Sequence, residues 1–443
     1  MEAFFILAHM KKTNIEELYK IYLKHSSLSK DSRNIPEASI YLALKGENFN
    51  GNTFADEALR KGAAYVVIDE EKVWKDNRYL LVDDVSESLQ QLAHYHRKQL
   101  NIPIIAISGS NGKTTTKELI AAALSKKFNT LCTLGNYNNH IGVPLTLLRI
   151  TQEHEMAIIE MGANHQGEIA FLCQITAPNF GMLTNIGKAH LEGFGGEAGV
   201  RKGKTEMFKY IDNNKGTLFI NLDDSKIKAS VPENVKFITY SVNEPAQYKG
   251  KLLETHPRLV GTWESSSESG EINSALYGAY NFHNILAACT IASHFGVEAS
   301  EIDDAINTYE SDMNRSQLVK KLGANIYLDA YNANPSSMSL SLDNFEKVQA
   351  EKKVAILGDM LELGDSTSVE HQNIIAQVQD CNSIDLCVFI GKYFSEHIYT
   401  NKKVAFFKTT EAAATWFRAN KWDGFTLLLK GSRGMKLETI LEN

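Results

Sequence analysis

No apolar run in this sequence of 443 residues approaches the roughly 20 residues that a membrane-spanning helix needs. An excess of positive charge is missing too, because 46 lysines and arginines face 53 acidic residues and leave a net charge of -7. Such a chain has no general electrostatic attraction for nucleic acid or for an anionic membrane. We therefore expect no nucleic-acid partner and no membrane insertion, and any phosphate-rich ligand must be captured locally.

The N-terminus lacks the features of a signal peptide, since its apolar stretch 4–8 has no basic start and no small-residue cleavage site. Cysteine pairs at metal-binding spacing are also missing. The cysteines are scattered along the chain, as Cys132, Cys173, Cys289, Cys381 and Cys387. We interpret them as reduced core residues of a cytoplasmic protein. Internal repeats and long low-complexity tracts are absent, and the length suggests about three ordinary domains.

Short apolar segments alternate with helical segments along most of the chain. The apolar segment 102–108 is followed by apolar residues at helical spacing between 117 and 128. Further strands are predicted at 156–161, 180–186, 218–222, 326–331, 354–360, 386–391, 404–408 and 425–430. Fully apolar strands separated by helices are typical of parallel sheets covered on both faces. We predict an α/β protein with three domains, at residues 1–100, 101–312 and 313–443, and a loop or hairpin edge at 254–278.

A glycine-rich loop joins the strand at 102–108 to the helix that follows it. The loop contains Gly109, Ser110, Asn111, Gly112, Lys113, Thr114 and Thr115. Its glycines let the backbone curl so that N–H groups converge on phosphate oxygens, and the helix start adds its positive dipole end. Lys113 supplies charge for the β and γ phosphates, and Thr114 offers a hydroxyl to Mg²⁺. Ile107 replaces the first glycine of the common motif, so we predict a shortened ATP-binding loop; the alternative is an ordinary strand–helix turn.

Polar residues follow several predicted strands, where open α/β sheets bind ligands. Glu160 ends a strand and is either a metal ligand or a helix-capping carboxylate. His190 lies in a glycine-rich loop, where a lone histidine is more often structural, although two such loops beside one phosphate loop favour a metal site. Lys204 belongs to a basic segment that is ordinarily a solvated helix start. Asn138 and Asn139 lie in an asparagine-rich turn, and we expect them to contact substrate.

Charged and amide residues also follow three predicted strands of the last domain. They are Asp329, Asn332 and Asn334 after the first strand, Asp359 and Glu362 after the second, and Lys430 and Arg433 after the third. Because the carboxyl ends of parallel strands meet at one edge, these groups predict a second ligand-binding edge.

These segments, taken together and in order, resemble the Mur ligase family over almost the whole chain. The strings that carry the resemblance are DSRNI, YLALKGENFNG, GSNGKTTTKE, LGNYNNHIGVPLTLL, EMGANHQGEI, TNIGKAHLEGFG, YNANP, GDMLELG and KGSRG. The resemblance implies a cytoplasmic, ATP-dependent amide ligase of peptidoglycan precursor synthesis with one or two Mg²⁺ ions. YNANP, GDMLELG and NNHIGVPLTLL favour UDP-N-acetylmuramoyl-tripeptide and D-alanyl-D-alanine as the substrates, joined through an acyl phosphate.

The resemblance also implies roles for individual residues. It implies a UDP-binding N-terminal domain, a central ATPase and a C-terminal Rossmann-like domain. The UDP-sugar site would include Ser32 and Arg33. Nucleotide contacts would come from Asn281, Asn284, Arg315 and Asp329. The metal site would include Thr114, Glu160, His190 and an N-carbamylated Lys204, and the substrate contacts Asn138, Asn139, Asn332 and Asn334.

The chain departs from the family pattern at three places. Tyr280 stands where the family has the histidine of a His-Asn pair, and Leu328 replaces the first of two aspartates. Asn50 and Asn52 replace an acid and a histidine, which leaves individual UDP-sugar contacts open. Two alternatives also stay open: a sibling ligase, such as folylpolyglutamate synthase or the enzyme adding the third peptide residue, and a non-catalytic nucleotide-dependent module. A monomer is our default expectation, and the third residue of the acceptor peptide, diaminopimelate or lysine, is not determined.

Overall fold

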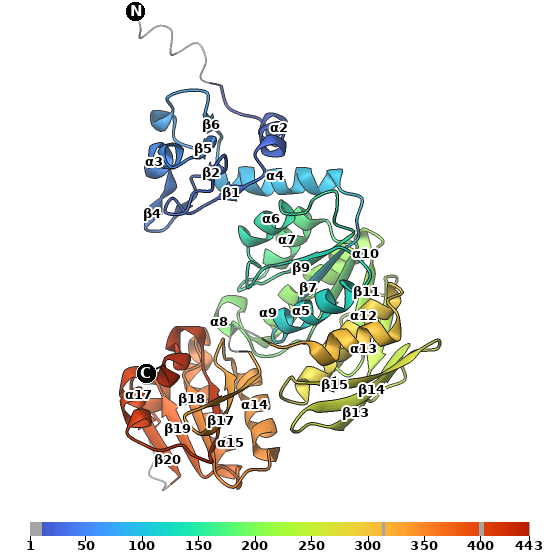
Figure 1. The fold of residues 1–443 in the computed structure, drawn as a ribbon, viewed down its shortest axis with the longest axis vertical. Coiled ribbons are helices and arrows are strands. Elements are labelled where there is room, and N and C mark those ends of the chain that lie inside the picture. Colours follow the sequence, from blue (N-terminus) through green and yellow to red (C-terminus); the bar gives the residue numbers. More distant parts are fainter. Residues whose placement is uncertain (1–10, 312–314, 398–402, 443) are drawn as a thin grey trace, which may run out of the picture. The chain divides into compact units, whose positions relative to one another are not determined.

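The computed structural model describes residues 11–311, 315–397 and 403–442, and it divides into two compact units (Figure 1). Unit 1 takes its residues from 1–106, 129–161 and 170–179, and unit 2 from 107–128, 162–169 and 180–443. The predicted domain boundary at 312–313 lies outside the described residues.

The first part of unit 1 is a small parallel sheet with helices packed against it. Its strand order is β1-β2-β5-β6, and all three pairings are parallel. The strands are β1 (Leu28–Ser29), β2 (Ile40–Leu42), β5 (Tyr65–Ile68) and β6 (Tyr79–Leu81), and a short hairpin is formed by β3 (Lys45–Gly46) and β4 (Phe49–Asn50). The helices are α2 (Ile15–Lys24), α3 (Ala55–Arg60) and α4 (Val85–Gln99). Tyr41, Val66 and Leu81 belong to the core beneath them.

The rest of unit 1 surrounds a parallel strand pair. The pair is β8 (Thr130–Cys132) and β9 (Met156–Glu160), accompanied by α6 (Gly142–Leu147) and most of α7 (Glu168–Thr176). The predicted strand at 156–161 is thereby confirmed, and all its residues are buried because it is apolar on both faces. Glu160 is its last residue.

A nine-stranded sheet has the order β15-β14-β13-β12-β11-β10-β7-β9-β8, and β7 (Ile104–Ser108) has residues in both units. The unit 2 strands are β10 (Phe180–Leu183), β11 (Thr217–Asn221), β12 (Lys236–Ser241), β13 (Tyr248–Glu254), β14 (Leu259–Glu264) and β15 (Ser269–Ser274). Strands β10 to β13 pair in parallel. Strands β13 to β15 are antiparallel, so the hairpin edge predicted at 254–278 is confirmed, and the sheet is not parallel throughout.

Helices accompany this part of unit 2. They are α5 (Lys113–Leu124), α8 (Leu191–Phe194), α9 (Glu197–Lys204), α10 (Glu206–Asn213), α11 (Ser225–Lys228), α12 (Tyr280–His294) and α13 (Ala299–Thr308). The helix predicted after the glycine loop is α5. Figure 1 shows α12 and α13 on the same side as α5.

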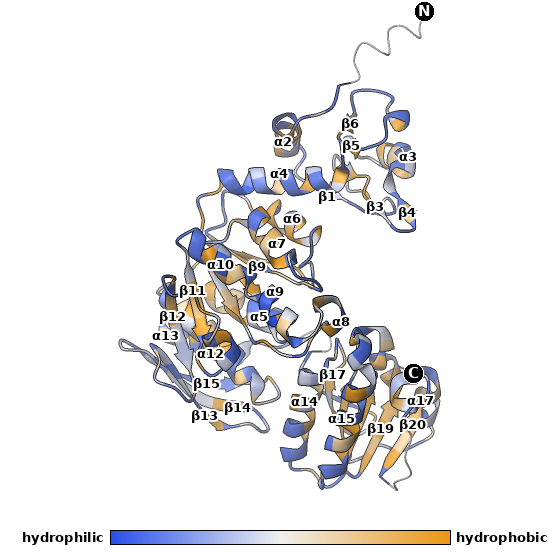
Figure 2. Ribbon diagram, turned by 180° about the vertical axis from the view of Figure 1, so that it is seen from behind, coloured by the Kyte–Doolittle hydropathy of each residue, from blue (hydrophilic) through white to orange (hydrophobic). Residues whose placement is uncertain are grey.

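The C-terminal part of unit 2 is a six-stranded sheet with the order β16-β17-β21-β18-β19-β20. Its strands are β16 (Gln317–Lys321), β17 (Ala324–Asp329), β18 (Lys353–Gly358), β19 (Leu386–Ile390), β20 (Val404–Phe407) and β21 (Thr426–Lys430). Five of them were predicted, and they are parallel. The polar edge strand β16 was not predicted, because its half-exposed residues carry no apolar run; it is antiparallel. The strands are predominantly hydrophobic in Figure 2, as buried parallel strands must be.

Helices cover both faces of this sheet. They are α14 (Pro335–Lys347), α15 (Thr367–Asp380), α16 (Lys392–Ser395) and α17 (Thr410–Arg418), with short 3₁₀ turns η3 (Gly364–Ser366), η4 (Arg433–Met435) and η5 (Leu437–Leu441). Helix α17 and turn η5 share a core cluster with Ile356 and Leu429. Tyr327 packs against Phe345 of α14, with ring centroids 6.0 Å apart. The sheet is therefore doubly wound, as the alternating strands and helices predicted.

A buried lysine fastens one end of α14 to this sheet. Lys353 is 1% exposed, and its amine donates to the carbonyls of Phe345 (3.0 Å), Glu346 (2.7 Å) and Val348 (3.0 Å) and to Ser383 Oγ (2.8 Å). A cation at a helix C-terminus satisfies carbonyls that have no partner within the helix. Burial lowers the pKa of Lys353.

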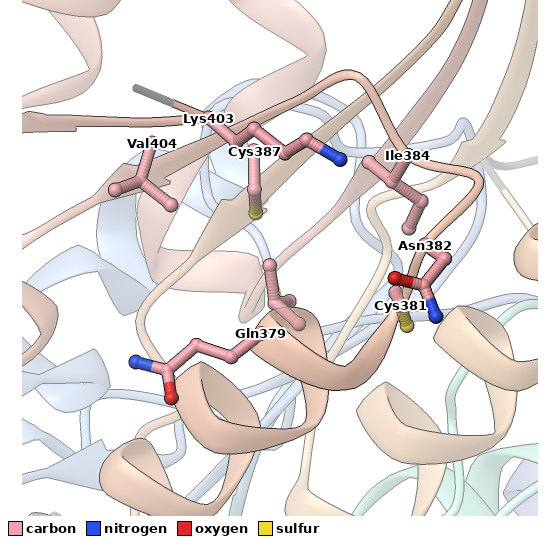
Figure 3. A pocket seen from close by; sticks show the side chains of 8 residues that line it. Gln379, Cys381, Asn382, Ile384, Cys387, Lys403 and Val404 are labelled. Carbon is pink, nitrogen blue, oxygen red and sulfur yellow. The ribbon is translucent and has the colours of Figure 1, made fainter. Parts of the chain in front are cut away.

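A small cavity lies at the amino ends of β19 and β20, with Cys387, Lys403 and Asn382 around it (Figure 3). It is at the opposite edge from the charged groups that follow the strands. Four of the five cysteines are buried, and Cys132 is half-buried, in keeping with their interpretation as core residues. None of the helices in the described parts of the chain has the length and apolar character required to cross a membrane.

Candidate functional site

The glycine loop between β7 and α5 is shaped by two left-handed glycines. Gly109 has φ +138° and Gly112 has φ +77°. A Cβ atom at Gly109 would lie 2.1 Å from Thr184 Oγ1, and one at Gly112 would lie 2.9 Å from the side-chain amide of Asn284. Only glycine tolerates both the backbone conformation and the close approach.

The loop is held in this shape by the segment that follows β10. Ser110 N donates to Asn185 O, and Asn111 N donates to Asn185 Oδ1, both at 3.0 Å. Asn111 O accepts from Asn185 Nδ2 at 3.0 Å and from Thr184 Oγ1 at 2.5 Å. The sequence predictions did not include Thr184 and Asn185. Their position in the polar carboxyl end of the strand predicted at 180–186 was the available signal.

The functional residues of the loop stand at the start of α5. Thr114 and Thr115 are buried, and Lys113 donates from Nζ to Gly109 O at 2.9 Å and to Ser110 O at 3.3 Å. The free N–H groups of the first helical turn and the Lys113 ammonium concentrate positive charge at this point. The strand–loop–helix prediction is therefore met by the local geometry that phosphate binding requires.

Asn284 of α12 lies directly against the glycine loop, as its approach to Gly112 shows. Asn281 is 1% exposed; its Nδ2 donates to Tyr277 O at 2.6 Å, and its Oδ1 accepts from Asn284 Nδ2 at 2.8 Å. Asn281 thus orients Asn284, and the two predicted nucleotide residues act as a connected pair within the protein.

The turn after β17 reaches the glycine loop. Asn334 caps α14 through its Oδ1 and donates from Nδ2 to Asn111 Oδ1 at 2.7 Å. Two residues later, Ser336 Oγ accepts from Lys188 N at 2.8 Å, and Lys188 Nζ pairs with Glu370 at 2.6 Å. The second predicted ligand edge therefore meets the phosphate loop inside unit 2.

His190 occupies the same segment and also contacts the C-terminal sheet. It has a left-handed backbone (φ +51°), and its Nδ1 pairs with Glu362 Oε2. The hydrogen bond from His190 is the main cause that lowers the pKa of Glu362. Glu362 follows β18, so a third strand end contributes to this region.

Lys204, the last residue of α9, is buried (1% exposed), so its interpretation as a solvated lysine is wrong. Its amine donates to Ala163 O at 3.1 Å and lies 5.1 Å from the ring centroid of Phe194. Burial, and then the charge of Lys113, lower its pKa well below the ordinary value. A buried amine of lowered pKa is easily deprotonated and therefore nucleophilic.

Asp329 and Arg315 are engaged within the C-terminal part of unit 2. Asp329 Oδ2 accepts from Lys430 Nζ at 2.5 Å and from Ser341 Oγ at 3.1 Å. The guanidinium of Arg315 lies 3.4 Å from the ring centroid of Tyr331. Asn332 is exposed, and its Oδ1 accepts from Ala333 N at 2.9 Å, which forms the turn.

In unit 1, Glu160 is buried at the end of β9. Its Oε1 accepts from Asn138 Nδ2 at 2.7 Å, and its N donates to Thr133 Oγ1 at 2.9 Å. Glu160 Oε2 is buried and has no hydrogen-bond partner among the described residues. A buried carboxylate oxygen without a donor suits a cation. Asn139 Oδ1 accepts from Ile141 N and Gly142 N, so it builds the turn before α6.

The predicted UDP-sugar residues follow β1. Ser32 is buried, whereas Arg33 is exposed and makes a two-point pair with Asp31, which lowers the pKa of Asp31 to about 2. Asn50 and Asn52 turn inward: Asn50 donates to Glu70 (2.9 Å) and Asn52 to Asp69 (2.8 Å). Asn50 and Asn52 thus make structural hydrogen bonds at the positions where the family has an acid and a histidine.

The role of Thr114, Glu160, His190 and Lys204 in a metal site stays a prediction. No group of three or more histidine, cysteine, aspartate or glutamate residues is gathered as a metal site in the part of the chain that the structure describes. Each unit has an oxygen donor that suits Mg²⁺ by its chemistry: the Thr114 hydroxyl in unit 2 and the unpartnered oxygen of Glu160 in unit 1.

Comparison with known proteins gives three matches to family profiles in consecutive order. They are the Mur ligase family catalytic domain at residues 25–107, the Mur ligase middle domain at 107–292, and the Mur ligase, glutamate ligase domain at 314–433. A UDP-N-acetylmuramoyl-tripeptide--D-alanyl-D-alanine ligase of Bacillus subtilis is 31% identical, covering 93% of this chain and 92% of that protein.

Solved structures agree with these matches. The crystal structure of MurF from Acinetobacter baumannii has a TM-score of 0.84 at 30% identity, covering 94% of this chain and 92% of that one. MurF ligase from Thermotoga maritima, in complex with ADP, has a TM-score of 0.83 at 26% identity, covering 94% and 96%. The similarity therefore extends over nearly the whole chain.

The two buried lysines should respond oppositely to replacement by methionine. Lys353→Met removes the donor of three carbonyls and should cost about 3 kcal/mol, seen as a lower melting temperature. Lys204→Met removes a buried cation that donates to the carbonyl of Ala163, and it should leave the melting temperature unchanged or higher. Because the folded pKa of Lys204 is lowered, wild type should gain stability relative to Lys204→Met as pH rises towards 10.5. Thermal unfolding in carbonate-free buffer measures both; a large loss for Lys204→Met would contradict the prediction.

Proposed function

The chain belongs to the Mur ligase family, and we propose that it joins D-alanyl-D-alanine to UDP-N-acetylmuramoyl-tripeptide with hydrolysis of ATP to ADP and phosphate. The observation that carries the proposal is the contact between Asn334 and Asn111 at 2.7 Å, which brings the YNANP turn against the phosphate loop. An acceptor held by the C-terminal strand ends would there meet a phosphorylated donor. The names of the similar ligases and the ADP bound by one of them support the choice of substrates.

The chemistry requires activation of a carboxylate. A carboxylate oxygen of the tripeptide attacks the γ-phosphorus, the bond to the bridging oxygen of ADP breaks, and an acyl phosphate forms. The amine of D-alanyl-D-alanine then attacks the acyl carbon, loses a proton, and expels phosphate. Lys113 and the N–H groups at the start of α5 neutralise charge on the transferring phosphoryl group. The other residues mainly position the reactants.

Magnesium is part of the proposal, because ATP is handled as its metal complex. Bound Mg²⁺ would neutralise phosphate charge and orient the γ-phosphoryl group. Thr114 and Glu160 fit as ligands by their chemistry, and Asn138 fixes the carboxylate of Glu160. His190 and Lys204 stay proposed members of the metal site. A cytoplasmic monomer completes the proposal, since ATP and UDP-linked precursors are cytoplasmic substrates.

Purified protein should release phosphate from ATP only when both UDP-N-acetylmuramoyl-tripeptide and D-alanyl-D-alanine are present. The reason is that phosphoryl transfer needs the tripeptide carboxylate and turnover needs the dipeptide amine. Phosphate release and product mass measure the reaction, with lysine and diaminopimelate tripeptides compared. Release that ignores the dipeptide would overturn the proposed function, and turnover with glutamate or diaminopimelate as the amine would identify a sibling ligase.

Lys113→Ala should lower turnover at least about 10³-fold, because the loop loses its charge at the β and γ phosphates. Folding should be intact, since Lys113 is only half-buried and the carbonyls it contacts belong to the loop itself. Lys126→Ala, just beyond the other end of α5, is the matched control and should keep full activity. Retained activity in Lys113→Ala would refute the assigned role of the loop.

Lys204 should carry a carbamate in the active protein, because its lowered pKa supplies the neutral amine that reacts with carbon dioxide. Labelling with ¹³C-bicarbonate should give one carbamate resonance that is absent in Lys204→Ala. Short carboxylates should restore part of the activity of Lys204→Ala. An unlabelled lysine whose replacement leaves activity unchanged would remove it from the site.

A further inference from the structure

Two guanidinium groups gather around one tyrosine at the edge of the C-terminal sheet. Strands β17 and β21 are parallel neighbours, with Asp329 opposite Lys430, so the loops that follow them lie side by side. The Tyr331 ring centroid is 3.4 Å from the guanidinium carbon of Arg315 and 5.6 Å from that of Arg433. Arg315 is already a predicted nucleotide residue, whereas Arg433 has no role in the mechanism above.

Arg433 is held in place by the residues around it. The preceding Ser432 donates from N to Asp359 O (3.2 Å) and accepts at Oγ from Leu361 N (2.9 Å), which ties its loop to the one after β18. Arg433 Nη1 donates to Glu438 Oε1 at 2.9 Å. The side chain is nevertheless 59% exposed, and only one of its N–H groups is used in this pair, so the guanidinium has N–H groups to offer to a further anion.

The charges around Tyr331 favour a single anion. Arg315 and Arg433 contribute two positive charges and Glu438 one negative charge, which leaves one positive charge. Arg315 Nε is buried with no hydrogen-bond partner among the described residues. This balance suits one carboxylate. A triphosphate carries several charges and already has the glycine loop and Lys113.

The turn that carries Tyr331 also reaches the phosphate loop, which suits a dipeptide acceptor. Asn334 touches Asn111 of that loop, and Tyr331 stands three residues earlier in the same turn. An extended dipeptide spans about 7 Å from its amine to its carboxylate. A dipeptide whose amine reaches an acyl phosphate at the loop would extend its carboxylate along this turn, on which Tyr331 lies.

We propose that Arg433 binds the C-terminal carboxylate of the incoming D-alanyl-D-alanine, with Tyr331 and Glu438 orienting its guanidinium. The inference rests on the proposed function and adds the residue that recognises the far end of the acceptor. Because the contact is remote from the reacting amine, its loss should raise KM for the dipeptide more than it lowers kcat.

Ligation kinetics with two acceptors test the proposal. Arg433→Ala should raise KM for D-alanyl-D-alanine roughly 10- to 100-fold and leave KM for ATP within about twofold. D-alanyl-D-alaninamide, which lacks the carboxylate, should be a poor acceptor for the wild type. Arg433→Ala should use the acid and the amide equally well. Arg433→Lys, which keeps the charge but loses the planar fork, should fall between.

The possible results distinguish a failure of the role of Arg433 from a failure of the proposed function. Arg418→Ala, an exposed arginine at the end of α17, is the control and should match the wild type. An unchanged KM for the dipeptide in Arg433→Ala, a persisting preference for the acid, or an equal rise in KM for ATP would each overturn the role of Arg433 alone. A wild-type protein that does not ligate the dipeptide would overturn the proposed function and this inference together.

Discussion

The curl of the glycine loop is the constraint on which the arrangement of unit 2 depends. Gly109 and Gly112 adopt left-handed backbones because Thr184 and Asn284 occupy the space that side chains would need. The segment after β10 supplies the hydrogen bonds that keep the curl. That same segment continues to Lys188 and His190, which contact the loops after β17 and β18. One stretch of chain thus holds the phosphate loop and joins it to the acceptor edge. Few hydrogen bonds separate the phosphate loop from the acceptor edge, so a displacement of one is passed on to the other.

Buried lysines show how charge is distributed around this arrangement. Lys353 is surrounded by carbonyls and Lys430 is paired with Asp329, so both are compensated within the fold. Lys204 has a carbonyl and an aromatic ring, and Lys113 repels it. Burying an uncompensated cation is unfavourable. The burial of Lys204 is understandable if its amine is neutral or modified in the working protein. Its burial then serves chemistry rather than stability.

Much of the fold could be predicted from the sequence, since apolar runs such as 354–357 are stable only when buried, as in a parallel strand covered on both faces. The motifs and their order along the chain also predicted the family and the strand–loop–helix unit. The strand β16 could not be predicted, because polar edge strands have no periodic signal. Asn139 and Asn332 were expected to meet substrate, yet each accepts a local backbone N–H, and asparagine serves turns and ligands with the same atoms. Burial of Lys204 depends on packing from distant segments, so its charged neighbours in the sequence were misleading.

Lys430 and Arg433 both stand at the carboxyl end of β21, and the fold itself distinguishes them. Lys430 is 2% exposed, and its ammonium is 2.5 Å from the carboxylate of Asp329, so a substrate carboxylate would have to displace a buried partner. Arg433 bonds to the carboxylate of Glu438 through Nη1 alone, and its side chain is 59% exposed. A guanidinium already held by a carboxylate and near an aromatic ring loses less freedom on binding. Arg433 is therefore the residue that recognises the far carboxylate. The buried Lys430 fixes the register of β17 and β21, whose ends present Arg433.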